Sequence, residues 1–165
     1  MSQRLICIGF FGSLLDPDVL HIVLDSPLQA LHRQTALLPG FARYRVEQET
    51  FPALAPHSES CVEGLLVSGL SEEDGRRICF FEGDEFVLQK HHVQTLDGAT
   101  HEALVFRATE LIALSSEPWS LNHWQQQHKP LYLQMSRDWM QAYGTAGYQE
   151  LNQQWRHALG LKPVA

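Results

Sequence analysis

The sequence predicts an α+β fold in a single domain over residues 1–165. A short apolar run near its start is typical of a buried strand, and an Asp-Gly pair at Asp97-Gly98 is typical of a β-hairpin. From Glu117 onward the chain carries helix signals instead. Because strand and helix signals are mixed without strict alternation, the pattern favours α+β over a doubly wound sheet. A chain of this length can bury about 70% of its unfolded surface, which is enough for one core.

The first expected element is a strand over residues 5–11, which is too short and too rich in Ile and Phe for a helix. Gly12-Ser13 ends this strand. Asp16 stands before a proline, and this pair predicts a short helix over residues 17–24.

The middle of the chain is expected to add strands. Leu-Pro-Gly at residues 38–40 predicts a turn, and residues 41–49 alternate between apolar and polar as a half-exposed strand does. Two prolines within residues 52–56 predict a loop or a strand edge. A further strand is predicted over residues 61–70, where Gly64 indicates a bulge or a close approach of another backbone.

A helix and a hairpin are expected next. The capping-box pattern of residues 71–74 predicts a helix start, and Gly83 predicts its end. Strand-like runs over residues 86–95 and 101–107 flank Asp97-Gly98, which predicts the hairpin.

Three helices are predicted after residue 117. The first begins at Pro118, the second spans Leu131 to Tyr143 after a break at Pro130, and the third spans Ala146 to Leu159. An apolar stripe at a spacing of four is formed by Leu131, Met135, Trp139 and Tyr143. We expect this stripe to pack on its own domain, rather than to form a pocket lid or a dimer surface.

The composition excludes several classes of protein. Twelve Lys and Arg against nineteen Asp and Glu give a formal charge of −7, which disfavours nucleic-acid binding. No apolar stretch is long enough to span a membrane. Three widely spaced cysteines, Cys7, Cys61 and Cys79, argue against a disulfide framework and for a reducing cytoplasm. Cys79, beside Phe80, is expected to be a buried structural thiol.

Two sequence features could carry chemistry. The Gly turn at residues 11–14 lies between a strand and a helix, where backbone N–H groups can hold an anion without any basic side chain. The other reading of this segment is a common strand-to-helix turn. Glu82 follows two Phe residues at a helix end and is either a buried acid with a raised pKa or part of a solvated turn with Asp84 and Glu85.

Six short motifs occur along the chain. They are Phe11-Gly12-Ser13-Leu14, Leu38-Pro39-Gly40-Phe41, Phe51-Pro52-Ala53-Leu54, Val62-Glu63-Gly64, Leu70–Asp74 and Phe81–Phe86. In these motifs and their order, over about residues 4–110, the chain resembles the gamma-glutamylcyclotransferase-like family, which includes the avirulence-induced plant proteins and gamma-glutamylamine cyclotransferase.

The resemblance implies a small mixed β-barrel with flanking helices over about residues 4–110 and a helical C-terminal extension over residues 116–165. It also implies a small-molecule gamma-glutamyl substrate, an amine or a peptide, that is cyclised to 5-oxoproline with release of the free amine. Glu82 would be the general acid/base. Substrate binding would fall on Phe11, Gly12, Ser13, Leu14 and Phe86. No metal, nucleotide or other cofactor is expected, and the oligomeric state is open between monomer and homodimer.

Three positions depart from the family pattern. Phe11 and Phe86 stand where the family has tyrosines, so two hydroxyls are missing, and Cys79 stands where an aspartate is frequent. The alternative hypothesis is therefore a catalytically inactive binding protein of the same fold.

Histidines on the predicted hairpin are candidate metal ligands. His91 or His92 could meet His101 across the hairpin, but adjacent strand residues point to opposite faces and no carboxylate or Cys has ligand spacing there. We therefore expect surface histidines.

Overall fold

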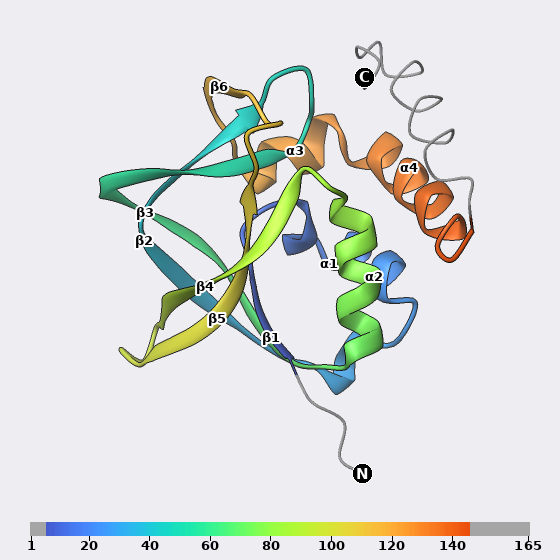
Figure 1. Ribbon diagram of the computed structural model, residues 1–165, viewed down its shortest axis with the longest axis horizontal. Coiled ribbons are helices and arrows are strands. Elements are labelled where there is room, and N and C mark those ends of the chain that lie inside the picture. Colours follow the sequence, from blue (N-terminus) through green and yellow to red (C-terminus); the bar gives the residue numbers. More distant parts are fainter. Residues whose placement is uncertain (1–5, 146–165) are drawn as a thin grey trace.

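A closed ring of five strands is the centre of the structure, a computed structural model that describes residues 6–145 (Figure 1). The strands are β1 (Ile6–Phe10), β2 (His32–Val46), β3 (Pro52–Leu70), β4 (Phe86–Thr95) and β5 (Thr100–Ala108). They follow the order β3-β1-β5-β4-β2, and β2 pairs with β3 to close the ring. The β1–β5 pair is parallel and the other pairs are antiparallel. The expected α+β fold with a small mixed barrel is confirmed.

The turn predicted at residues 38–40 is wrong. These residues lie inside β2, which begins at His32 rather than at residue 41. The register against β3 shifts between Pro39 and Phe41, and Gly40 has a φ of +84°. Proline and a left-handed glycine are as typical of a β-bulge as of a turn, and the long pairing with β3 decides for the bulge.

The prolines of residues 52–56 lie in a strand, so the loop alternative is wrong and the edge alternative is confirmed. Pro52 pairs with Arg45 and Pro56 pairs with Phe41. In the described residues this part of β3 has β2 on one side only, because β1 pairs with β3 from Leu65 onward. A proline has no N–H to donate, and an unpaired strand side needs none.

Gly64 marks a close backbone approach. A Cβ at this position would lie 2.3 Å from the Phe10 carbonyl oxygen and 2.4 Å from Cδ1 of Phe11. The irregularity in the β1–β3 register falls elsewhere, between the pairs Ile8–Val67 and Ile6–Leu70. Gly64 therefore lets β3 lie directly against the end of β1, where the Gly turn begins.

The helices before residue 85 follow their sequence signals. Helix α1 (Pro17–Leu24) is capped by Asp16, whose Oδ1 accepts hydrogen bonds from the amides of the first turn. Helix α2 (Glu72–Glu82) carries the predicted capping box between Ser71 and Asp74 and ends at Gly83. The hairpin of β4 and β5 is also confirmed. Two short 3-10 helices, η1 (Ser13–Leu15) and η2 (Leu28–Ala30), flank α1.

The helix start predicted at Pro118 is wrong. Pro118 ends a strand, β6 (Leu114–Pro118), which pairs with β2. Helix α3 (Leu121–Gln127) begins after Ser120, whose hydroxyl accepts the amide N–H of His123. The backbone partner on β2 and the hydroxyl cap together displace the helix start by three residues.

Helix α4 (Lys129–Gln141) begins two residues before the predicted Leu131 and carries Pro130 in its first turn. It ends before the predicted Tyr143. The helix predicted over residues 146–159 lies outside the described residues.

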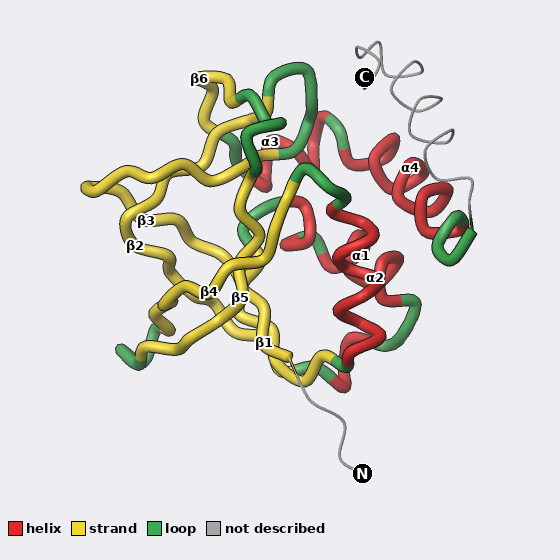
Figure 2. Tube along the Cα trace, in the orientation of Figure 1, coloured by secondary structure: helices red, strands yellow, loops and turns green. Residues whose placement is uncertain are grey.

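The stripe on α4 packs on its own domain at three of its four positions. Met135, Trp139 and Tyr143 are partly buried and pack against the hydrophobic core that contains Leu20 and Trp124. Leu131, in contrast, is 47% exposed. The indole N–H of Trp139 donates to the Phe80 carbonyl of α2 at 3.2 Å. Helices α1, α2 and α4 therefore form one layer on the same side of the barrel (Figure 2).

Two cores result from the alternation of strand side chains. Ile8 and Phe10 of β1 face the helix layer, with residues such as Leu20 and Trp124, while Phe11 lies with Val105 among strand residues inside the barrel. In the part of the chain that the structure describes, no helix is long and apolar enough to cross a membrane.

Candidate active site

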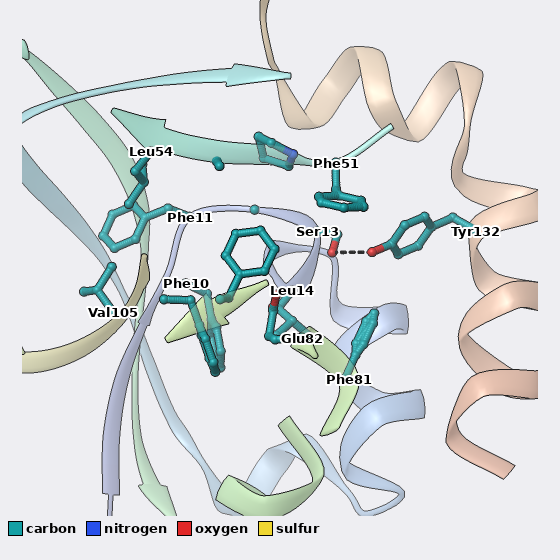
Figure 3. A pocket seen from close by; sticks show the side chains of 16 residues that line it. Phe10, Phe11, Ser13, Leu14, Phe51, Leu54, Phe81, Glu82, Val105 and Tyr132 are labelled. Atoms are coloured by element: carbon teal, nitrogen blue, oxygen red, sulfur yellow. Dashed lines mark hydrogen bonds between the residues drawn. The ribbon is translucent and has the colours of Figure 1, made fainter. Parts of the chain in front are cut away.

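A cavity of about 90 Å³ opens where the end of β1, the start of β3 and the end of α2 meet α4 (Figure 3). Of the 16 described residues that line it, only Ser13, Glu82 and Tyr132 have polar side-chain atoms. Phenylalanines make up much of the remaining wall, and no lysine or arginine is among these 16 residues. Within the part of the chain that the structure describes, polar groups for a ligand therefore come from these three side chains and from the backbone.

The Gly turn supplies such backbone groups. Three successive carbonyls are occupied: that of Phe11 accepts from Arg43, that of Gly12 from the Leu15 amide at 3.0 Å, and that of Ser13 from the Asp16 amide at 3.0 Å. In a trans peptide the C=O and the next N–H point in opposite directions. The amides of Gly12, Ser13 and Leu14 therefore point away from these partners, and within the described residues they make no hydrogen bond.

Arg43 orients the first of these amides. Its Nη1 lies 2.9 Å from the Phe11 carbonyl oxygen and 3.3 Å from that of Glu63, and its guanidinium stacks 5.0 Å from the centre of the Trp119 ring. Arg43 does not line the cavity. By holding the Phe11 carbonyl on its own side, it directs the Gly12 N–H the other way.

Glu82 reaches the cavity because of its position on α2. The buried residues Gly75 and Ile78 precede it by seven and four positions, so Glu82 continues the inward face of the helix. Burial of its carboxyl group raises the pKa of Glu82 to about 7. No hydrogen bond from the described residues reaches this carboxyl. It is therefore a group that can hold or release a proton near neutral pH.

A hydroxyl pair lies at the same cavity. Ser13 Oγ and Tyr132 Oη are 2.9 Å apart and come from η1 and α4 (Figure 3). The Tyr132 ring packs edge-on against Trp124 and Phe81. Burial, together with the negative charge of Glu82, raises the pKa of Tyr132. This tyrosine therefore keeps its proton at neutral pH and can donate a hydrogen bond.

The structure brings all six sequence-predicted residues to one cavity: Phe11, Gly12, Ser13, Leu14, Glu82 and Phe86 all line it. The Phe11 ring, however, points toward Leu54 and Val105 and away from Ser13 (Figure 3). Phe11 therefore contributes its backbone to the site and its side chain to the barrel interior. Phe86 lies at the start of β4, with its ring against that of Phe51.

The prediction for Cys79 is wrong: this residue is exposed. It follows the buried Ile78 on α2 and so lies on the outward face of the helix. The histidines of the hairpin do not gather either. His101 bonds the hydroxyl of Thr95, whereas His91 lies beside Arg107. Within residues 6–145 no group of three or more His, Cys, Asp or Glu could hold a metal ion.

Sequence reasoning missed two residues of the site, Tyr132 and Arg43. Both act across long separations, 119 residues from Tyr132 to Ser13 and 32 residues from Arg43 to Phe11. Neither has a local pattern that would have revealed it. Tyr132 stands one position beside the recognised stripe on α4, and the buried face of α4 is Tyr132, Ser136 and Met140.

Comparisons with known proteins identify the family and the fold. The family model described as gamma-glutamyl cyclotransferase, AIG2-like, matches residues 8–141, from β1 to the end of α4. Two Arabidopsis thaliana proteins are similar over most of their length. AIG2-like protein A is 24% identical over 138 residues, which cover 81% of this chain and 80% of that protein. AIG2-like protein D is 25% identical over 133 residues, which cover 78% and 84%.

Solved structures share the fold. A solution structure of an Arabidopsis thaliana protein superposes with a TM-score of 0.61 at 22% identity, covering 88% of this chain and 97% of that one. A structure named gamma-glutamyl cyclotransferase superposes with a TM-score of 0.58 at 12% identity, covering 93% and 99%.

Proposed function

The chain belongs to the AIG2-like family of gamma-glutamyl cyclotransferases, and on this premise we propose that it cyclises a gamma-glutamyl amine or peptide to 5-oxoproline and releases the free amine. The α-amino nitrogen of the glutamyl group attacks its own γ-carbonyl carbon. A ring C–N bond forms, the C–N bond to the leaving amine breaks, and one proton moves from the attacking to the departing nitrogen.

The amides of Gly12, Ser13 and Leu14 bind the α-carboxylate in this proposal. Three N–H groups in a concave turn can replace the water around a carboxylate without a basic side chain. Holding the carboxylate also fixes the α-carbon, which brings the α-nitrogen toward the γ-carbon. Much of the acceleration would come from this orientation, because cyclisation requires one conformer of a flexible side chain.

Glu82 carries the proton. The α-nitrogen attacks as a free amine, after its ammonium form has released one proton to solvent. As a carboxylate Glu82 accepts a proton from this attacking nitrogen, and as a carboxylic acid it donates that proton to the departing nitrogen. A carboxyl group performs both tasks best when its pKa lies near the working pH, and the pKa of Glu82 is about 7. The observation that carries the proposal is that this carboxyl lines the same cavity as loop amides that make no hydrogen bond within the described residues.

The test is release of 5-oxoproline from a panel of gamma-glutamyl amines and peptides. We expect the wild type to release it and Glu82→Gln to lose at least about 100-fold in kcat, the usual contribution of a general acid/base. The matched control is Glu72→Gln, an exposed carboxylate at the other end of α2, which should retain activity. A wild type that releases no 5-oxoproline from any compound, or equal release by Glu82→Gln, would contradict the catalytic role.

A binding protein without turnover is the second candidate, and one observation favours it. Neither Phe11 nor Phe86 brings a hydroxyl to the cavity. Calorimetry with gamma-glutamyl compounds separates the two functions. Binding that depends on the loop residues, without release of 5-oxoproline, would support this candidate.

A further inference from the structure

The polar side chains of the cavity are few enough to be assigned one by one. Glu82 is engaged in proton transfer under the proposed function, which leaves Ser13 and Tyr132 as the only other polar side chains in the described lining. They lie in one hydrogen bond of 2.9 Å, with either hydroxyl as donor.

A pair of hydroxyls has more hydrogen-bonding capacity than one bond uses. One of the two protons lies between the oxygens, and the second remains available to an acceptor in the cavity. A hydroxyl that stays protonated is required for this, and Tyr132, whose pKa is raised by burial and by the charge of Glu82, meets the requirement.

The pair is held in a fixed position from both sides. Tyr132 packs against the Trp124 ring, with centroids 5.1 Å apart, and against the Phe81 ring, with centroids 6.2 Å apart. Ser13 is buried and belongs to the turn whose amides make no hydrogen bond among residues 6–145. The hydroxyl proton that the Ser13–Tyr132 hydrogen bond does not use therefore lies next to those amides.

We propose that Tyr132 is a substrate-positioning residue: its hydroxyl, held by Ser13, donates a hydrogen bond to the α-carboxylate that the loop amides bind. This inference rests on the proposed function. It means that α4 completes the substrate site, because without Tyr132 the described lining has no neutral side-chain donor apart from Ser13.

Steady-state kinetics of Tyr132→Phe tests the role. Loss of a hydrogen bond to a charged group should raise KM about tenfold, with kcat changed less than about twofold, because the carboxylate does not change in the reaction. The matched control is Tyr143→Phe, which removes a hydroxyl that donates to Glu73 at 3.1 Å, outside the cavity. It should leave both constants unchanged.

A second variant protects the test against a folding defect. Ser13→Ala leaves the tyrosine ring in place but frees its hydroxyl, and it should raise KM by a similar factor. In the double variant KM should rise by less than the product of the two single-variant factors, as expected for a coupled pair. A folded Tyr132→Phe or Ser13→Ala protein with an unchanged KM would overturn the inference, and so would a loss confined to kcat.

Binding separates failure of this inference from failure of the proposed function. The probes are 5-oxoproline, which keeps the carboxylate, and 2-pyrrolidone, which lacks it. Tyr132→Phe should weaken binding of 5-oxoproline about tenfold and leave 2-pyrrolidone unaffected. If the wild type has no activity, weakened 5-oxoproline binding still supports the role of Tyr132, whereas unchanged binding, or none in the wild type, overturns it.

Discussion

The buried carboxylate of Asp16 accepts a hydrogen bond from Lys129 at 2.9 Å, and this contact joins the start of α1 to the start of α4. Asp16 is fully buried, and its second oxygen caps α1. Gln125 donates to the same carboxylate at 2.9 Å. The contact anchors the helix that carries Tyr132 to the residue directly after η1, so it stabilises the geometry of the cavity as well as the fold.

Lys129→Met should lower the free energy of unfolding by about 1–3 kcal/mol, because it leaves a buried carboxylate without its cationic partner. The control is Lys90→Met, because the ammonium group of Lys90 lies 3.7 Å from Glu102 in an exposed pair. This variant should change the free energy of unfolding by no more than about 0.5 kcal/mol. Urea denaturation of the two variants at neutral pH measures the difference. Equal changes in the free energy of unfolding would contradict the larger stabilising effect expected of the Lys129–Asp16 contact.

The same contact should show a pH dependence. Burial raises the pKa of Asp16, but the hydrogen bonds from Lys129 and Gln125 outweigh it and hold the pKa below its usual 3.8. A lowered pKa gives a stability contribution that is complete above about pH 4 and is lost as the pH falls through the native pKa. The difference between wild type and Lys129→Met should therefore shrink in acid.

Glu82 should destabilise the fold as the pH rises from about 4.5 to about 7. Its pKa is raised from 4.5 to about 7, so between these values the unfolded chain releases a proton that the native protein keeps. Stability is therefore lost as the pH rises through this interval, by about 3 kcal/mol in all. Glu82→Gln cannot ionise, so its stability relative to wild type should increase between pH 4 and pH 8.5 in urea titrations. A constant difference would mean that the carboxyl is solvated.

Activity should depend on the same proton. Below pH 7 Glu82 is increasingly protonated and cannot accept the proton of the attacking α-amino nitrogen, so kcat/KM should fall about tenfold per pH unit on the acid side. A rate profile from pH 5 to pH 8 locates the midpoint. A midpoint near 4.5 would indicate a carboxyl in open solvent and would contradict the buried geometry.

Arg43→Met should impair substrate binding through the Gly12 amide. Without the guanidinium, the Phe11 carbonyl loses its hydrogen-bond donor, and the peptide group between Phe11 and Gly12 is free to rotate. KM should therefore rise about fivefold, which corresponds to about 1 kcal/mol of lost hydrogen bonding. Arg107→Met is the control, because this arginine is also stacked on a ring, 4.5 Å from the centre of Phe41, and does not contact the turn. A KM increase of equal size in both variants would assign the effect to general stability.

Local signals in the sequence identified much of the framework and part of the site. Short-range interactions define the capping residues Asp16 and Ser71 and the turn at Asp97-Gly98. Their partners lie within a few residues in sequence, so these features can be predicted from the sequence alone. The family motifs likewise marked the Gly turn and Glu82. The sequence alone could not decide whether Glu82 was buried, although its spacing from Gly75 and Ile78 is that of an inward helix face.

Long-range contacts decided the rest. Residues 38–40 form a bulge and not a turn because β3 runs alongside them, and Pro118 ends a strand because β2 lies beside it. Tyr132 faces Ser13 across 119 residues of chain, and only the packing of α4 on the rest of the fold brings their hydroxyls together. Hydrogen-bonding capacity is a property of each residue, but its partner is set by tertiary packing, which no local pattern encodes.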